Sequence, residues 1–216
     1  MTALLVILMV PAFAEPLGGT WRVDIEAAST SEAMWIESRT GLHTVGVLRW
    51  DGDTTRYRVC DLRPDGGVVR TVIPQAWISS LAEREVHASL EADRVRIDLG
   101  TSSVGFDPRQ GPLASVDLDA AIDQDGDGEP GVTLAVWVPL LGDGEVYVAE
   151  QSSIRLAGLL LDATHVEGRV DVESAHVVLG ATPAVLARQA NVRALPSQSW
   201  FTLTAVPAAA TCDDFK

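Results

Sequence analysis

The amino-acid sequence predicts an all-β fold, an antiparallel β-barrel or β-sandwich of about ten strands with one or two short helices. Three observations support this prediction. Apolar and polar residues alternate with a period of two, as in residues 94–99 (RVRIDL), which is typical of strands with one buried face. Turns rich in glycine and aspartate separate the alternating segments. Helical periodicity is scarce along the chain.

The predicted strands share this alternation or a high content of β-branched and aromatic residues, and turn-forming residues separate many of them. Besides 94–99 they are residues 20–27, 42–51, 55–62, 68–73, 85–91, 102–106, 132–139, 145–150, 154–162, 167–179 and 199–206. Hairpin-type turns are indicated at residues 51–53 (DGD), 64–67 (PDGG) and 142–144 (GDG).

Two segments predict short helices. Residues 74–81 begin with a proline, which is favoured at the first helical position. In residues 182–189, Thr182 is the expected N-cap, Pro183 follows it, and residues 184–189 contain good helix formers.

Residues 1–14 are predicted to be a secretory signal peptide. They carry no charged side chain, and residues 4–10 (LLVILMV) form an unbroken apolar run that Pro11 ends. Small residues in 12–14 (AFA) precede the expected cleavage before Glu15. The run is shorter than the roughly 20 apolar residues that cross a bilayer, so no membrane span is expected. A buried first strand is the alternative; otherwise the mature protein is periplasmic or secreted.

The composition indicates a single globular β-rich domain over residues 15–216. Hydrophobic residues make up 47% of the chain and charged residues 21%, which is ordinary for a folded protein. The formal net charge of −14 argues against nucleic acid and anionic membranes as partners, because binding to phosphates needs clustered Lys and Arg. The same charge is compatible with cation binding.

Cys60 and Cys212 are the only two cysteines in the sequence. In an exported protein an even number predicts a disulfide. The bridge would close a loop of about 150 residues, and chain entropy assigns it roughly 4–5 kcal/mol. No other cysteine or histidine lies at close spacing to either residue, so a metal site is not predicted there.

Gly19-Thr20-Trp21, at the start of the first predicted strand, resembles the G-x-W motif of lipocalins, whose Trp plugs one end of the barrel. The pairing of Cys60 with Cys212 is similar to that family's bridge from a middle strand to the C-terminal segment. The family's T-D-x-x-Y motif is absent, and the chain is longer than usual. The resemblance implies a barrel and a small apolar ligand.

Residues 123–132 and 144–149 resemble exported proteins of unknown function from δ-proteobacteria. This resemblance implies a Gram-negative cell envelope and no particular activity.

The segment 123–129 (DQDGDGE) predicts a calcium loop. Asp123, Asp125 and Asp127 stand at positions 1, 3 and 5 and a glycine at position 6, so that alternate carboxylates of a tight turn converge on one point. The carbonyl of Glu129, at position 7, is expected to complete part of the shell. The predicted metal ligands are therefore these three aspartates and Glu129.

Three carboxylates and one carbonyl are fewer than the six to eight oxygens that Ca²⁺ takes. The Glu that an EF-hand has at position 12 is Leu134 here. Further ligands have to come from elsewhere, and the nearest candidates are Asp117, Asp119, Glu129 and Asp143. The alternative is a solvated acidic turn. Repulsion among crowded carboxylates favours the cation, whose role is expected to be structural.

No catalytic centre is predicted. The sequence lacks a G-x-S-x-G motif, a P-loop and a dinucleotide fingerprint, and its four histidines are dispersed. They are His43, His87, His165 and His176. Most of the six tryptophans are expected in the core, with a ligand cavity or a carbohydrate-stacking surface as the alternative.

Three functions follow as hypotheses. The leading one is an exported non-enzymatic binding module for a small apolar ligand, with a structural calcium loop. The second is a calcium-stabilised structural or adhesive surface protein, which predicts an exposed apolar or aromatic patch for a protein partner. The third is an exported hydrolase that acts through carboxylates.

Overall fold

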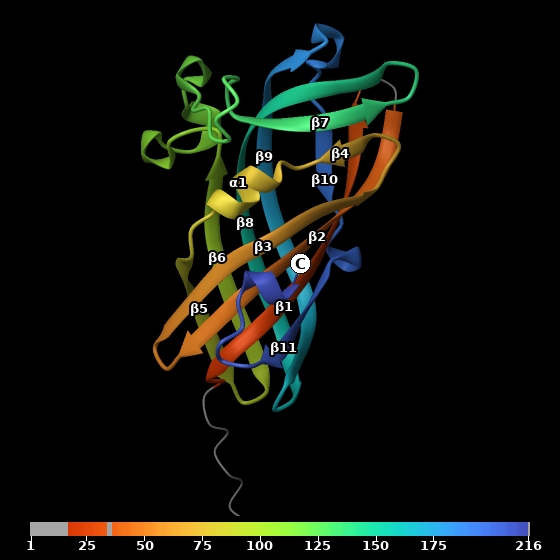
Figure 1. The fold of residues 1–216 in the computed structure, drawn as a ribbon. Helices are drawn as coiled ribbons and strands as arrows, with labels where there is room; N and C mark the ends of the chain where they lie inside the picture. Colours follow the sequence, from red (N-terminus) through yellow and green to blue (C-terminus); the bar gives the residue numbers. More distant parts are fainter. Residues whose placement is uncertain (1–16, 34–35, 216) are drawn as a thin grey trace, which may run out of the picture.

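The computed structural model describes residues 17–33 and 36–215 of the chain. The expected signal peptide, residues 1–14, lies outside the described residues. The described chain forms one antiparallel sheet of eleven strands with few helical residues (Figure 1). The predicted all-β class is therefore confirmed.

The strands are β1 (Gly19–Ala33), β2 (Ile36–Asp51), β3 (Thr54–Gly66), β4 (Arg70–Val72), β5 (Arg84–Glu91), β6 (Arg94–Val104), β7 (Val132–Val138), β8 (Gly142–Asp162), β9 (His165–Thr182), β10 (Asn191–Ala194) and β11 (Trp200–Val206). The single α-helix in the described chain is α1 (Gln75–Ser80). Short 3₁₀ turns occur at Pro108–Gln110, Leu113–Ser115, Leu118–Ala120, Ala184–Leu186, Pro196–Gln198 and Cys212–Phe215.

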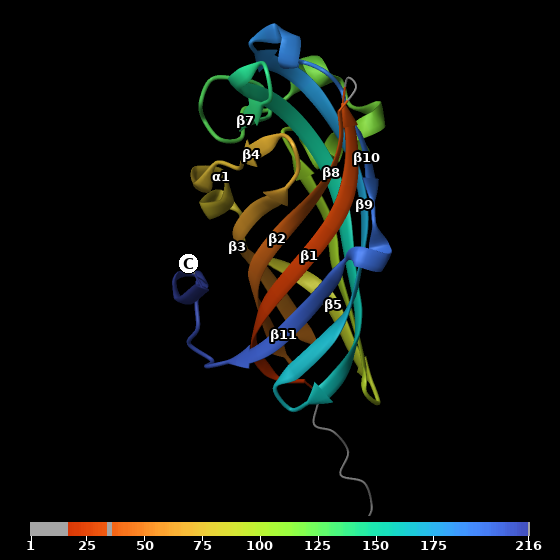
Figure 2. The ribbon, with the colours of Figure 1, turned by 90° about the vertical axis from the view of Figure 1, so that its right-hand side faces the viewer.

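Eight of these strands close into a barrel. They follow the order β8-β6-β5-β3-β2-β1-β11-β9, and β9 pairs back onto β8. Of the remaining strands, β7 continues the edge of β8 beyond β6, β4 pairs with β7, and β10 pairs with the far end of β1. Figures 1 and 2 show an elongated barrel with α1, β4 and β7 gathered at one end. Of the two predicted architectures, the structure therefore adopts the barrel.

The half of the barrel away from α1 is filled with large apolar side chains. Trp21, Leu48, Tyr57 and Phe201 are among its fully buried members. Burial of such a side chain contributes roughly 1.5–3 kcal/mol, and burial also raises the pKa of the Tyr57 hydroxyl.

In the half near α1, strands β8 and β9 turn polar side chains inward, while Trp77 and Ile78 of α1 form an apolar cluster with Val132. On β8 and β9, the alternation that points Leu156 and Val170 into the core also points Ser152 and Ser174 inward. Two residues further along the strands, Glu150 stands opposite His176. Burial raises the pKa of Glu150, with a hydrogen bond from the Ser152 hydroxyl opposing it, and burial lowers the pKa of His176.

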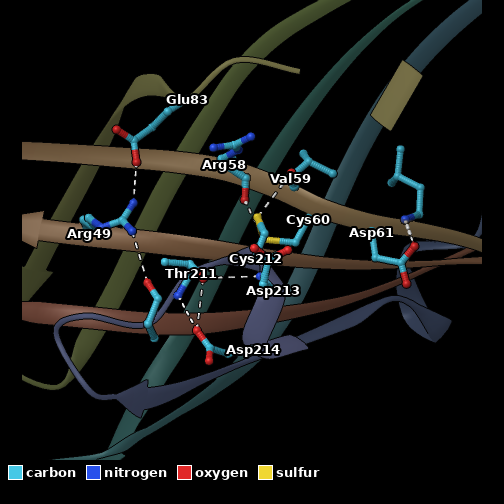
Figure 3. The surroundings of a disulfide bond; sticks show 12 residues. Arg49, Arg58, Val59, Cys60, Asp61, Glu83, Thr211, Cys212, Asp213 and Asp214 are labelled. Carbon is cyan, nitrogen blue, oxygen red and sulfur yellow. Dashed lines mark hydrogen bonds and ion pairs between the residues drawn. A yellow bond between two sulfur atoms is a disulfide. The ribbon is translucent and has the colours of Figure 1, made fainter. Parts of the chain in front are cut away.

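The predicted disulfide is present between Cys60 on β3 and Cys212 near the C-terminus, with Cα atoms 5.0 Å apart. It ties the C-terminal segment across the outer face of β2 and β3 (Figures 2 and 3). Arg49 supports the segment by donating to the carbonyl of Ala210 at 3.1 Å while also pairing with Glu83. A disulfide is compatible with an extracellular or periplasmic protein.

The second predicted helix is wrong over most of its length. Only Ala184–Leu186 forms a 3₁₀ turn. The side chain of Gln189 bonds the exposed edge of β9, accepting from Val178 N at 3.0 Å and donating to His176 O at 2.8 Å. The chain has to extend along β9 to make these bonds, which overrides its helical propensity. The helix predicted at 74–81 is confirmed as α1.

Four predicted strands merge into two. Segment 94–99 and residues 102–104 of the second segment belong to β6, which a bulge at Gly100 (φ +72°) interrupts without ending it. Segments 145–150 and 154–162 belong to β8, whose polar middle the neighbouring strands hold extended.

Candidate metal centre

The predicted acidic loop lies in the connection between β6 and β7, on the outside of the barrel near α1 (Figure 1). Phe106 and Leu113, in the first part of this connection, are buried in a small apolar cluster against Ala149 of β8. The first part of the connection is therefore packed against the barrel wall, and the acidic segment comes directly after this packed part.

Two glycines hold the ends of the connection against β8. A Cβ on Gly105 would lie 2.8 Å from the carbonyl oxygen of Val148, and one on Gly131 would lie 2.8 Å from the Leu179 side chain. Both glycines have positive φ angles, +74° and +89°. Ile122 joins them, since its N–H donates to Gly105 O at 2.9 Å and its carbonyl accepts from Gly131 N at 3.0 Å.

Asp123, Asp125 and Asp127 come together in the structure. One carboxylate oxygen from each lies within 4.8 Å of the others. This convergence is the arrangement that the 1, 3, 5 spacing predicts, and it could hold a metal ion. Oxygen-only donors of this kind suit Mg²⁺, Ca²⁺ or Mn²⁺.

The Asp123 carboxylate organises the turn. It accepts backbone N–H bonds from Gly126 at 2.7 Å, Asp127 at 3.3 Å and Gly128 at 2.9 Å. The bond from Gly128 is the largest cause that lowers the pKa of Asp123, and those from Gly126 and Asp127 add to it. The carboxylate is therefore held in its charged, ligating form.

The two carboxylate oxygens of Asp125 differ in their hydrogen bonding. Its Oδ2 accepts the backbone N–H of Thr133 at 2.8 Å, while its Oδ1 is buried without a hydrogen-bond partner in the described chain. The hydroxyl of Thr133 is also buried, and it has no hydrogen-bond partner among the described residues. Buried polar oxygens without partners are uncommon, because each carries a desolvation cost. A cation beside them would remove that cost.

The other candidate carboxylates are not part of this cluster. Among the described acidic groups, the carboxylates of Glu129, Asp117, Asp119 and Asp143 do not join the three aspartates. Glu129 instead donates its backbone N–H to Asp127 at 2.9 Å. Thr133 was missed by the sequence analysis, because a threonine opening a strand is indistinguishable from ordinary β-sheet composition.

Comparisons with protein-family models, with curated proteins and with solved structures found no significant match. The lipocalin and δ-proteobacterial resemblances therefore stay predictions. Within residues 17–33 and 36–215, no helix is long and apolar enough to cross a membrane.

Proposed function

We propose that this chain is an exported, non-enzymatic binding module whose acidic loop is a structural calcium site. The observation that carries the proposal is the oxygen cluster of Asp123, Asp125 and Asp127, in which Asp125 Oδ1 is buried and has no hydrogen-bond partner in the part of the chain that the structure describes. The disulfide supports export, because such bonds persist in oxidising compartments.

Calcium fits this donor set better than magnesium does. Ca²⁺ accepts six to eight oxygens in irregular geometry, whereas Mg²⁺ demands a near-ideal octahedron. The three carboxylates, the carbonyl of Glu129 and the hydroxyl of Thr133 offer five protein oxygens, and water would supply the rest. A bound ion would fix the end of the connection to the start of β7 and so stabilise the folded state.

The proposed binding surface lies on the outside of the barrel. The half of the interior away from α1 is filled by core side chains. The half near α1 presents Ser152, Ser174 and Glu150 inward. These polar groups suit a small apolar ligand poorly. The outer face, in contrast, carries exposed Leu159, Leu161 and Trp200, the kind of patch that the surface-protein hypothesis predicts.

Thermal unfolding of the oxidised mature protein, from Glu15 onward, tests the calcium site. We expect the melting temperature to rise by several degrees from excess EDTA to millimolar Ca²⁺, because a ligand at 100 times its Kd adds about 2.7 kcal/mol. Asp125→Asn/Asp127→Asn should lose this rise.

Asp119→Asn/Asp143→Asn is the matched control, since it removes the same charge from exposed positions outside the cluster. This control should keep the full calcium response. A wild-type protein with no response to Ca²⁺ would reduce the loop to an acidic turn.

A further inference from the structure

The interior of the barrel opens to solvent in the half near α1. Leu156 and Val170, which face inward side by side on β8 and β9, are 2% and 1% exposed. The next inward pair, Ile154 and Val172, is partly exposed. Ser174, one step further along β9, is exposed although the same alternation turns it inward. Inward side chains meet solvent only where the interior is not filled, so this half holds a solvent-accessible space.

The barrel wall is interrupted beside this space. Residues 170–175 of β9 pair with β8 alone in the described chain, because the pairing with β11 ends at Arg169 and β10 pairs with β1. The side chain of Gln189 bonds the edge of β9 only from His176 onward. Solvent reaches the interior beside this unpaired stretch, where Ser174 is exposed.

A carboxylate faces this space without a cationic partner. Glu150 stands on the inward face of β8, one step beyond Ser152. It lies deep in the fold and is still only partly covered, as expected of a side chain that lines an internal space. Glu150 forms no ion pair with any described residue. Burial raises its pKa, because a desolvated carboxylate without a nearby cation is costly.

A guanidinium points into the interior from β5. Arg84 stands opposite Tyr57 and on the same face of the sheet, and the Tyr57 side chain belongs to the core. The guanidinium carbon of Arg84 lies 6.0 Å from the centre of the Tyr57 ring. Within residues 17–33 and 36–215, Arg84 forms no ion pair. Burial lowers its pKa, but an arginine stays charged at neutral pH.

Glu150 and Arg84 do not neutralise each other. Strand β6 lies between β5 and β8, which places the backbones of these two strands about 10 Å apart. Neither charge contributes to the pKa of the other, whereas Tyr57 contributes to that of Arg84. Ser102 on β6 and Ser152 on β8 form the inward pair between them. The interior thus offers an anionic and a cationic group several ångströms apart, with hydroxyl groups between them.

We propose that this half of the barrel binds a small linear zwitterion, an ω-amino acid whose ammonium meets Glu150 and whose carboxylate meets Arg84. Charge complementarity selects this class, because a cation would leave Arg84 unpaired and an anion would leave Glu150 unpaired. An α-amino acid is too short, since its ammonium and carboxylate share one carbon atom. A ligand without net charge is also neither attracted nor repelled by the net charge of −14.

Other occupants fit less well. An apolar molecule would cover both charges and the serine hydroxyls without giving them partners. A metal ion would meet at most Glu150 and His176, and among the described residues a group of three possible ligands occurs only in the acidic loop. The site is separate from the calcium loop and from the outer surface proposed above, so it stands or fails independently of them.

The test is calorimetric titration of the oxidised mature protein, in excess EDTA, with 4-aminobutyrate, 5-aminopentanoate and 6-aminohexanoate. We expect at least one of these zwitterions to bind. The alkylamine and the alkanoate of the same length each lack one charge, and each should bind at least about tenfold more weakly. Glycine should also bind more weakly, because its two charges cannot reach both side chains.

Glu150→Gln and Arg84→Gln should each weaken binding of the zwitterion by about tenfold or more, because each removes one charge-assisted contact. Glu150→Gln should also abolish the preference over the alkanoate, and Arg84→Gln the preference over the alkylamine. Arg56→Gln and Glu85→Gln are the matched controls, since these residues stand opposite each other on the exposed face of β3 and β5. Both controls should bind as the wild type does.

A second pair of variants locates the site. Ser174→Leu fills the interior and should abolish binding. Ala175→Leu, at the neighbouring exposed position whose side chain points outward, should leave binding unchanged. Circular dichroism and urea unfolding establish that each variant is folded.

Three results would overturn the proposal. The first is that none of the three zwitterions binds. The second is that the alkylamine or the alkanoate binds as tightly as the zwitterion. The third is that, without ligand, Glu150→Gln and Arg84→Gln each lower the free energy of unfolding and the double variant lowers it no further, which would show that the two side chains pair with each other. Loss of the calcium response with zwitterion binding intact would refute the metal site alone.

Discussion

The Asp125 carboxylate accepts the backbone N–H of Thr133 at 2.8 Å, so position 3 of the acidic loop is bonded to β7, the strand that follows it. One oxygen of Asp125 and the hydroxyl of Thr133 are left buried and unpartnered in the described chain. The acidic turn and the start of β7 thus form one unit, and a cation bound there would act on both.

Thr133→Val separates a ligand role of the hydroxyl from a structural one. Valine keeps the shape and removes the unpartnered oxygen. In EDTA we expect unchanged or slightly higher stability, because a buried polar atom without a partner is lost. In calcium we expect a smaller rise in melting temperature than in the wild type. Equal rises in both proteins would contradict a ligand role.

Asp123 should make the free energy of unfolding, measured in EDTA, decrease at acid pH. Its pKa lies below the ordinary value of 3.8 because the backbone N–H groups of Gly128, Gly126 and Asp127 bond to the charged form. The stabilisation is therefore present above pH 4 and is lost as the pH falls through the lowered pKa. In urea unfolding between pH 7 and pH 3, the free energy of unfolding should fall less for Asp123→Asn than for the wild type. Parallel curves would argue against this role.

Glu150 should behave in the opposite sense. Burial raises its pKa above 4.5, so its contribution to stability is greatest below pH 4.5 and declines as the pH rises through the raised value. Glu150→Gln should therefore raise the free energy of unfolding at pH 7 relative to wild type, with a smaller difference at pH 4. Urea titrations at both pH values measure it. Glu85→Gln, at an exposed site on β5, should show no such pH-dependent difference.

The disulfide between Cys60 and Cys212 should contribute strongly to stability. It closes a separation of 152 residues, and removing a native bridge of this kind costs roughly 2–5 kcal/mol. Cys60→Ser/Cys212→Ser should unfold at lower urea concentration than the oxidised wild type. Dithiothreitol should destabilise the wild type and leave the double variant unchanged. A wild type insensitive to reduction would show that the other contacts of the C-terminal segment hold it in place.

Gly168→Ala should destabilise the barrel. Phe201 lies over Gly168, and a Cβ there would be 2.6 Å from the Phe201 ring. Overpacking of this kind costs about 1–3 kcal/mol. Gly41→Ala is the control, because a Cβ at Gly41 would meet nothing closer than 3.8 Å. The comparison is made by urea unfolding, and equal losses for the two variants would refute this packing role of Gly168.

Local features of this protein could be predicted from the sequence because they depend on neighbouring residues. Alternation marks the buried face of each strand, since successive side chains point to opposite sides. The 1, 3, 5 spacing of Asp123, Asp125 and Asp127 converges within a single turn. The pairing of Cys60 with Cys212 needed no geometry, because the sequence offers no other partner.

Other features were decided by tertiary structure alone. The choice of barrel over sandwich depends on β9 pairing with β8 and on β11 joining β9 to β1. The row of Arg96, Ala157 and Arg169 places β6 beside the hairpin of β8 and β9, which follows it in the sequence only after the connection and β7. The burial of Asp125 Oδ1 depends on where Thr133 and β7 pack. The first two depend on the register between paired strands, which local alternation leaves open and which the hydrogen bonds and packing of the folded chain select. The third depends on how the acidic loop packs against β7.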